Sequence, residues 1–478
     1  MERRIATASR ASMGGATEPG GRGAKWGLRA ANQRASGPLQ ARVKCPVLLG
    51  LVAAALCACA GPVGAPGELP QAATTPRFDA ALVATGANLA VIGNCRGCHT
   101  SPEGPPLGGG TGFTTGFGTI YSTNISPDPE TGIGKWSEAA FARAMREGLD
   151  REGRHLYPAF PYDHFTRVTD ADDRAIYAYL MAQPPVVHRP PRNRLLFPFN
   201  VRESIAAWKM LYFEPGPKPL VNSDPVLARG EYLVEGLGHC ASCHTPRNAL
   251  QAEKRDQPYA GGEAEGWHAY ALNHDNAAPL PWTVDALAHY LRTGWAEGHG
   301  IARGTMGSVT VELANADPRD LRAMAAYVAS LMRGGAGASK NAAAMRVGAG
   351  DGSEGARIFG TTCEGCHDGS TPLPYGGMPL GLSIGVTGES PRNLVNVVLH
   401  GIPAAPGSVT SPQMPGYGRA LDDAQVEALV QWMRANLSGR PPWTGVSATI
   451  RASRAMDPEL TRFPPGGTGT DPAAKGQQ

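Results

Sequence analysis

The pattern Cys-x-x-Cys-His occurs three times in this chain and carries its most specific chemistry. Two thiols at this spacing can form thioethers with the two vinyl groups of one haem, which places the next histidine under the iron as its proximal ligand. Three covalently bound c-type haems are therefore expected. The attachment residues are Cys95, Cys98, Cys240, Cys243, Cys363 and Cys366, and the proximal ligands are His99, His244 and His367.

Two other uses of paired cysteines fit less well. Thioredoxin-like redox chemistry needs no histidine at the next position and would not repeat three times. A structural zinc site needs four ligands, which two motifs could share. The repeated flanking sequence described below instead favours one cofactor for each motif.

Second axial ligands are expected on a loop that follows a helix in each repeat. Met306 lies 12 residues after Gly294, and Met414 lies 13 residues after Gly401. A lone methionine is more often a core residue, but the loop position and the repetition favour Met306 and Met414 as iron ligands.

The first repeat departs from this pattern, because Phe160 stands 12 residues after Gly148 and cannot bind iron. His155 and His164 flank that position, so either could serve as the sixth ligand. An open coordination position and a methionine from elsewhere, Met181 or Met210, are the remaining alternatives. Met145 aligns with core positions of the other repeats and is expected to be a core residue.

The helices that position these residues are predicted from capping residues and from the spacing of apolar residues. Ser137, Thr283 and Ser390-Pro391 each precede an apolar pattern that stops at a glycine, as expected for helix starts and ends. Each repeat then closes with an amphipathic segment. The three segments run from Asp170 to Met181, from Asp317 to Met332 and from Asp422 to Leu437.

Domain boundaries follow from composition, and the fold class expected is all-α, with three tandem cytochrome c-like domains and long Gly/Pro-rich loops. At 478 residues, two to four domains are expected. The predicted parts are a leader and signal peptide (1–60), domain 1 (77–189), a connector (190–221), domain 2 (222–333), a flexible linker (334–350), domain 3 (351–439) and a disordered tail (440–478).

The N-terminal region predicts export. Residues 46–60 form a short apolar stretch preceded by Arg42 and Lys44, as in a signal peptide. Cleavage after Ala60 and lipidation of Cys59 are both compatible with the sequence. No run of 18 apolar residues follows, so membrane attachment must come from the N-terminus, a lipid or a partner.

Net charge gives no indication of a nucleic-acid partner, because 44 basic residues face 41 acidic ones. The 62 glycines and 42 prolines suit small domains whose chain loops around a flat cofactor. No dinucleotide-binding or nucleophile motif stands out elsewhere.

Residues 118–128, 131–134 and 155–162 closely resemble the triple-haem cytochrome c subunits of bacterial periplasmic dehydrogenases, and residues 230–248 resemble the second-haem segment of that family. Members serve membrane-bound alcohol and gluconate dehydrogenases, and related subunits accompany molybdenum hydroxylases. Many relatives have methionine where this chain has Phe160.

The resemblance implies an electron-transfer subunit rather than an enzyme. It would sit on the periplasmic side of the inner membrane, take electrons from a catalytic dehydrogenase subunit and pass them to ubiquinone or a terminal oxidase. The alternative is a peroxidase-like haem enzyme, or a small-ligand-binding protein, with an open site on the first haem.

Overall fold

The computed structural model describes residues 78–333, 351–367, 377–403 and 413–456. The predicted leader and signal peptide (1–60), the linker (334–350) and the end of the tail lie outside the described residues. We refer to 77–189, 222–333 and 351–439 as the first, second and third repeats.

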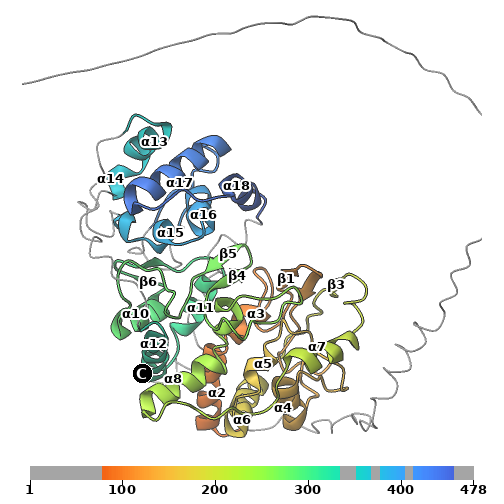
Figure 1. Ribbon diagram of the computed structural model, residues 1–478. Helices are drawn as coiled ribbons and strands as arrows, with labels where there is room; N and C mark the ends of the chain where they lie inside the picture. The colour runs from red at the N-terminus through yellow and green to blue at the C-terminus, as the bar shows by residue number, and fades with distance from the viewer. Residues whose placement is uncertain (1–77, 334–350, 368–376, 404–412, 457–478) are drawn as a thin grey trace, which may run out of the picture. The chain divides into compact units, whose positions relative to one another are not determined.

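Each repeat is built on a pair of packed helices (Figure 1). One helix precedes the Cys-x-x-Cys-His motif, and the other lies at the C-terminal end of the repeat. The pairs are α2 (Ala80–Ile92) with α6 (Asp170–Met181), α8 (Pro225–Glu235) with α12 (Pro318–Leu331), and α13 (Glu354–Thr362) with α17 (Asp423–Ser438). The C-terminal helices agree with the predicted segments to within one residue at each end.

A glycine lies at each of these helix crossings. A Cβ on Gly86 would meet the carbonyl oxygen of Ala175 at 1.8 Å, and one on Gly230 would meet that of Ala323 at 2.1 Å. Gly355 approaches the Ala428 carbonyl in the same way, at 2.4 Å. The same contact in all three repeats indicates one repeated packing unit.

The intermediate helices begin and end as the capping pattern predicts. They are α4 (Glu138–Glu147), α10 (Val284–Thr293) and α16 (Arg392–His400). The hydroxyls of Ser137 and Thr283 accept hydrogen bonds from backbone N–H groups three residues ahead. Gly148 and Gly294 end their helices in the left-handed region, which glycine adopts without strain.

The expectation of an all-α fold holds only in part, because short strands follow the motifs. β1 (Gly112–Thr115), β2 (Gly118–Tyr121) and β3 (Arg194–Leu195) form an antiparallel sheet in that order. β4 (Gly262–Ala264) pairs with β5 (Trp267–Ala269), and β6 (Trp295–Ala296) pairs with β7 (Gly300–Ile301). Turn glycines in these loops allow tight hairpins that composition alone did not indicate.

The connector packs on the first repeat. Besides β3 it forms α7 (Ser204–Tyr212), whose Lys209 ammonium donates hydrogen bonds to the carbonyl oxygens that end α4. The Trp208 and Phe213 rings lie edge-on to Tyr162, which belongs to the short helix α5 (Tyr162–Phe165). This part of the chain therefore extends the first repeat.

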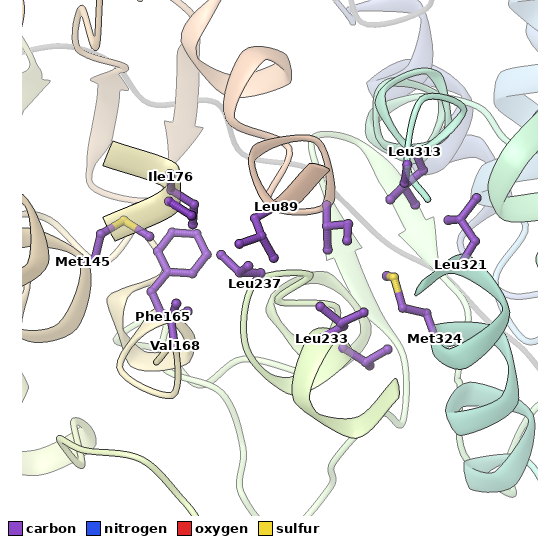
Figure 2. Packing of buried hydrophobic residues seen from close by; sticks show 14 of the residues in the cluster. Leu89, Met145, Phe165, Val168, Ile176, Leu233, Leu237, Leu313, Leu321 and Met324 are labelled. Atoms are coloured by element: carbon purple, nitrogen blue, oxygen red, sulfur yellow. The ribbon is translucent and has the colours of Figure 1, made fainter. Parts of the chain in front are cut away.

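The first two repeats share one apolar core. Leu89 from α2, Leu233 and Leu237 from the second repeat, and Phe165 from α5 belong to one buried cluster (Figure 2). Polar contacts reinforce it, since the Asn88 amide donates to Asp320 at 2.8 Å and accepts from the backbone N–H of Asp317.

The third repeat has a separate core that includes residues beyond its predicted end. It contains the 3₁₀ turn η1 (Leu380–Leu382) and the helices α15 (Ile384–Thr387) and α18 (Val446–Arg454). The prediction of a disordered tail is therefore wrong for α18. Trp443, Val446 and Ile450 are all buried in this core, and their apolar spacing explains why the segment folds.

None of the helices in the described parts of the chain has the length and apolar character needed to cross a bilayer.

Candidate haem sites

The three motifs lie on short helical turns directly after the first helix of each repeat. α3 (Cys95–His99) contains the first motif, and α9 (Ala241–His244) and α14 (Glu364–His367) begin just after Cys240 and Cys363. The two cysteines of each motif are not joined by a disulfide bond. A helical turn brings the two sulfurs and the histidine of each motif near one another, as attachment of one haem requires.

Each motif histidine is held by its Nδ1 atom. Nδ1 of His99 lies 2.6 Å from the carbonyl oxygen of Thr123, and Nδ1 of His244 lies 2.6 Å from that of Tyr270. Nδ1 of His367 lies 2.9 Å from the carbonyl oxygen of Met378. Because a carbonyl only accepts, Nδ1 carries the proton and Nε2 keeps its lone pair for a metal.

Burial favours the neutral ring over the imidazolium, since it lowers the pKa of His99, His244 and His367 against the opposing effect of the carbonyl contacts. A neutral imidazole with an oriented ring is the form that binds iron. The donor set therefore fits a haem in all three repeats.

Two observations count against the alternative uses of the paired cysteines. Burial, with smaller contributions from nearby groups, raises the pKa of Cys95, Cys98 and Cys240 to about 12, whereas reactive Cys-x-x-Cys thiols have lowered pKa values. Across the described ranges, the motif residues form no set of three ligand atoms close enough for one zinc ion.

The third repeat holds a partly open, apolar pocket next to its motif. His367 and Met414 both line it, with Cys363, Tyr417 and apolar side chains completing the wall. Met414 is fixed by two backbone hydrogen bonds with Ile402, at 2.8 and 2.9 Å. This loop therefore brings the thioether and the imidazole to one pocket, as a six-coordinate haem requires.

Met306 lies at the start of α11 (Thr305–Leu313), just after β7. The loop that carries it is closed by a hydrogen bond from the N–H of Ala302 to the carbonyl of Gly294, at 2.6 Å. Gly304 leaves room there for Trp267, whose ring lies 2.3 Å from the place where a Cβ would be. Met306 is half-buried and lies on the first turn of α11, rather than on the loop that the sequence predicted.

Phe160 occupies the equivalent place in the first repeat. The N–H of Leu156 donates to the carbonyl of Gly148 at 2.8 Å, as Ala302 does to Gly294, and Phe160 and Met306 each follow four residues later. The Phe160 ring packs against Phe165, with ring centroids 5.3 Å apart. An aromatic ring therefore takes the position where the second repeat has a thioether.

Two of the alternative sixth ligands for the first repeat point elsewhere. Nε2 of His164 lies 2.8 Å from the Glu253 carboxylate and its Nδ1 lies 2.9 Å from the carbonyl of Glu235, so both nitrogens are engaged by the second repeat. Met210 is 80% exposed on α7. Neither is placed to bind iron in the first repeat.

His155 and Met181 remain. The backbone of His155 forms an isolated β-bridge with Leu149, the residue after Gly148. Met414 forms the same kind of bridge with Ile402, the residue after Gly401. Nδ1 of His155 is buried and has no hydrogen-bond partner among the described residues. Met181 is buried at the end of α6, and Met145 lies in the core as predicted.

The first two sites adjoin each other. Helix α11, which carries Met306, packs on α3 and α2 of the first repeat. Burial chiefly raises the pKa of the Cys98 thiol, and Cys243 of the second motif contributes to the same shift. The two predicted attachment sites thus share a wall of protein.

Hydrogen bonds also join the second and third repeats. The Asn393 side chain accepts from the N–H of His268 at 2.9 Å and donates to its carbonyl at 2.8 Å. The Asn396 amide donates to the carbonyl of Gly266. These asparagines on α16 therefore attach to the β4–β5 hairpin, which follows the second motif.

Sequence reasoning missed both the carbonyl anchors of the histidines and the asparagine contacts. Any residue can supply a backbone carbonyl, so the side chains of Thr123, Tyr270 and Met378 give no sign of these contacts in the sequence. The resemblance had nonetheless covered the segment that holds Thr123.

Comparisons with known proteins agree with this geometry. A family model described as cytochrome c oxidase, cbb3-type, subunit III, matches residues 350–433. The chain is 35% identical over 409 residues to the alcohol dehydrogenase (quinone) cytochrome c subunit of Komagataeibacter europaeus, covering 80% of this chain and 86% of that protein. It is 37% identical over 400 residues to the gluconate 2-dehydrogenase cytochrome c subunit of Pantoea cypripedii, covering 78% and 88%.

A further relative is much longer than this chain. A nicotinate dehydrogenase subunit of Pseudomonas putida is 45% identical over 383 residues, which are 79% of this chain but only 32% of the relative. The chain thus spans about a third of that protein. The cytochrome c domain in residues 350–433 implies covalently bound haem iron and supports a role in electron transfer. By its similarity over most of their length, the chain belongs to the family of cytochrome c subunits of alcohol and gluconate dehydrogenases.

Proposed function

We propose that the protein is an exported cytochrome with three c-type haems, which relays electrons from a separate catalytic dehydrogenase subunit to ubiquinone or a terminal oxidase. When bound, each haem iron takes up and passes on one electron. Cys95, Cys98, Cys240, Cys243, Cys363 and Cys366 would attach the three groups.

The observation that carries this proposal is the common state of the three motif histidines. In every repeat a backbone carbonyl oxygen accepts a hydrogen bond from Nδ1–H, so the lone pair of Nε2 can bind a metal. Met306 and Met414 would complete the second and third sites, and thioether ligands raise haem potentials. The shared wall between the first two motifs and the contacts of the third repeat with the β4–β5 hairpin support a relay.

The catalytic partner is proposed from the names of the relatives. Two are cytochrome c subunits of alcohol and gluconate dehydrogenases, and a third is a subunit of nicotinate dehydrogenase. We propose alcohols, sugar acids and N-heterocycles as the substrate classes to be tested for the partner enzyme.

The test has two parts. Mass measurement of the mature protein should give three haem adducts, and fewer would contradict the haem count. Adding candidate substrates to membranes that hold the protein should produce the reduced haem absorption band. If dithionite reduces the haem but no substrate does, the dehydrogenase partnership is contradicted.

Phe160 motivates a second candidate function, in which the first haem binds a small ligand or reduces peroxide at an open position. Carbon monoxide added to the reduced protein distinguishes the two functions. A spectral shift in one third of the haem would favour the second candidate, and the absence of any shift would remove it.

A further inference from the structure

Exposed apolar side chains gather on the connector. Among the described residues, eight of the ten large hydrophobic side chains that are exposed lie between Val187 and Val221. They include Phe197 at 81%, Met210 at 80% and Leu211 at 65% exposure. Soluble monomers rarely collect such residues on one segment unless it meets another surface.

The connector residues divide between an inner and an outer face. On α7, Ile205 is buried and Trp208 donates to the carbonyl of Leu250, whereas Ala207, Met210 and Leu211 are exposed at helical spacing. The inner face is already occupied by contacts with the first and second repeats. The outer apolar face is therefore not needed to hold the connector in place.

Cations accompany this apolar surface. Residues 186–221 contain six Lys or Arg and only two Glu, although the whole chain is nearly balanced. Arg189, Arg192 and Arg194 are exposed and make no ion pair within the part of the chain that the structure describes. The acidic Glu214 is paired with Lys218 and Arg255, which reduces its repulsion of an anionic surface.

We propose that residues 187–221 dock on an anionic phospholipid surface, with Phe197, Met210 and Leu211 inserted among the headgroups and Arg189, Arg192 and Arg194 contacting lipid phosphates. Apolar residues interspersed with cations are the pattern of segments that lie in a membrane interface. Each arginine near an anionic leaflet adds to the attraction. This inference rests on the proposed location at the outer face of the inner membrane.

The test is co-sedimentation of the haem-loaded mature protein with vesicles of phosphatidylcholine alone or mixed with phosphatidylglycerol. Cys59→Ala is present in every sample, so that a lipid on Cys59 cannot anchor the protein. We expect binding to the mixed vesicles that weakens as salt is raised. The triple variant Phe197→Ser, Met210→Ser, Leu211→Ser should bind at least tenfold more weakly.

The arginine triple variant R189Q/R192Q/R194Q should lose the preference for phosphatidylglycerol. Val226→Ser, which changes an exposed residue of α8 outside the connector, is the matched control and should bind normally. Equal vesicle binding by all variants would overturn the proposal. So would loss of co-purification with the dehydrogenase partner without any vesicle binding, because the face would then serve a protein partner. Substrate-driven haem reduction is measured separately, so failure here leaves the proposed function standing.

Discussion

In the proposed haem sites, the ligand that faces each motif histidine would set the potential of the iron, and the repeats differ there by single residues. Met306 and Phe160 follow equivalent backbone hydrogen bonds by four residues, while Met414 lines the pocket of His367. Replacing Met306 with alanine should remove the thioether from one site and lower the potential of one haem. A redox titration checks this, with the core substitution Met324→Leu as control, and an unchanged titration would show that Met306 is not a ligand.

The converse substitution tests the first repeat. Phe160→Met places a thioether where the second repeat has one, so we expect carbon monoxide binding to the first haem, if present in the native protein, to be lost. The potential of that haem should rise. Spectra of the reduced variant with and without carbon monoxide measure the effect, and an unaltered potential would mean that position 160 does not face the iron.

His164 predicts a pH dependence of stability. Burial alone would lower its pKa, but the hydrogen bond with Glu253 and the nearby Asp163 outweigh burial and raise the pKa to about 9. Because the folded state holds the proton more tightly, the contribution is complete below about pH 6.5, the ordinary value, and is lost as pH rises through about 9.

Removing this pair should therefore destabilise the first two repeats mainly at neutral pH and below. His164→Gln should cost about 1–3 kcal/mol there, since it leaves the half-buried Glu253 with only Arg247, 3.8 Å away, as a cation. Denaturant unfolding at pH 6 and pH 10 measures the difference. Exposed His274→Gln is the control, and an equal loss at both pH values would contradict the ion pair.

At the level of helices, each repeat depends on the close contact between its first and last helix at a glycine. Gly230→Ala should destabilise the protein by about 1–3 kcal/mol, because its Cβ would overlap the Ala323 carbonyl and force α8 away from α12. Gly116→Ala adds a methyl group with no atom within 4 Å and serves as control in the same unfolding experiment. Equal stability of the two variants would show that the crossing can relax.

Helix α18 gives a second test at this level. A chain ending at Gly439 should lose about 5 kcal/mol from the third repeat, since Trp443, Val446 and Ile450 leave its core. A chain ending at Met456 keeps the helix and should unfold normally. Thermal unfolding of the two chains decides whether α18 belongs to the domain.

The sequence predicted well whatever depends on local pattern. Capping residues and terminal glycines located α4 and α10, and periodicity located α6, residue for residue. The pairing of His164 with Glu253 could not be predicted, because 89 residues separate them and nothing local joins them. Backbone carbonyl partners and short hairpins were missed for the same reason, since they depend on the folded path of the chain.

Across the whole molecule, contacts between repeats set how the haem sites are held together. Asn393→Ala should loosen the attachment of the third repeat to the β4–β5 hairpin, because it removes both hydrogen bonds with His268 and leaves the one from Asn396. Faster hydrogen exchange in residues 262–269 would be the result expected. Asn436→Ala removes a contact internal to α17 and is the control, and equal exchange in both variants would contradict the interface.

The single apolar core of the first two repeats has a consequence for how such proteins change over evolution. Leu89 and Leu233 cannot be shielded from water if either half is deleted, whereas the third repeat is enclosed by its own side chains. We therefore expect the first two motifs to be kept or lost together as the family changes. The third repeat could be exchanged without opening the core that the first two share.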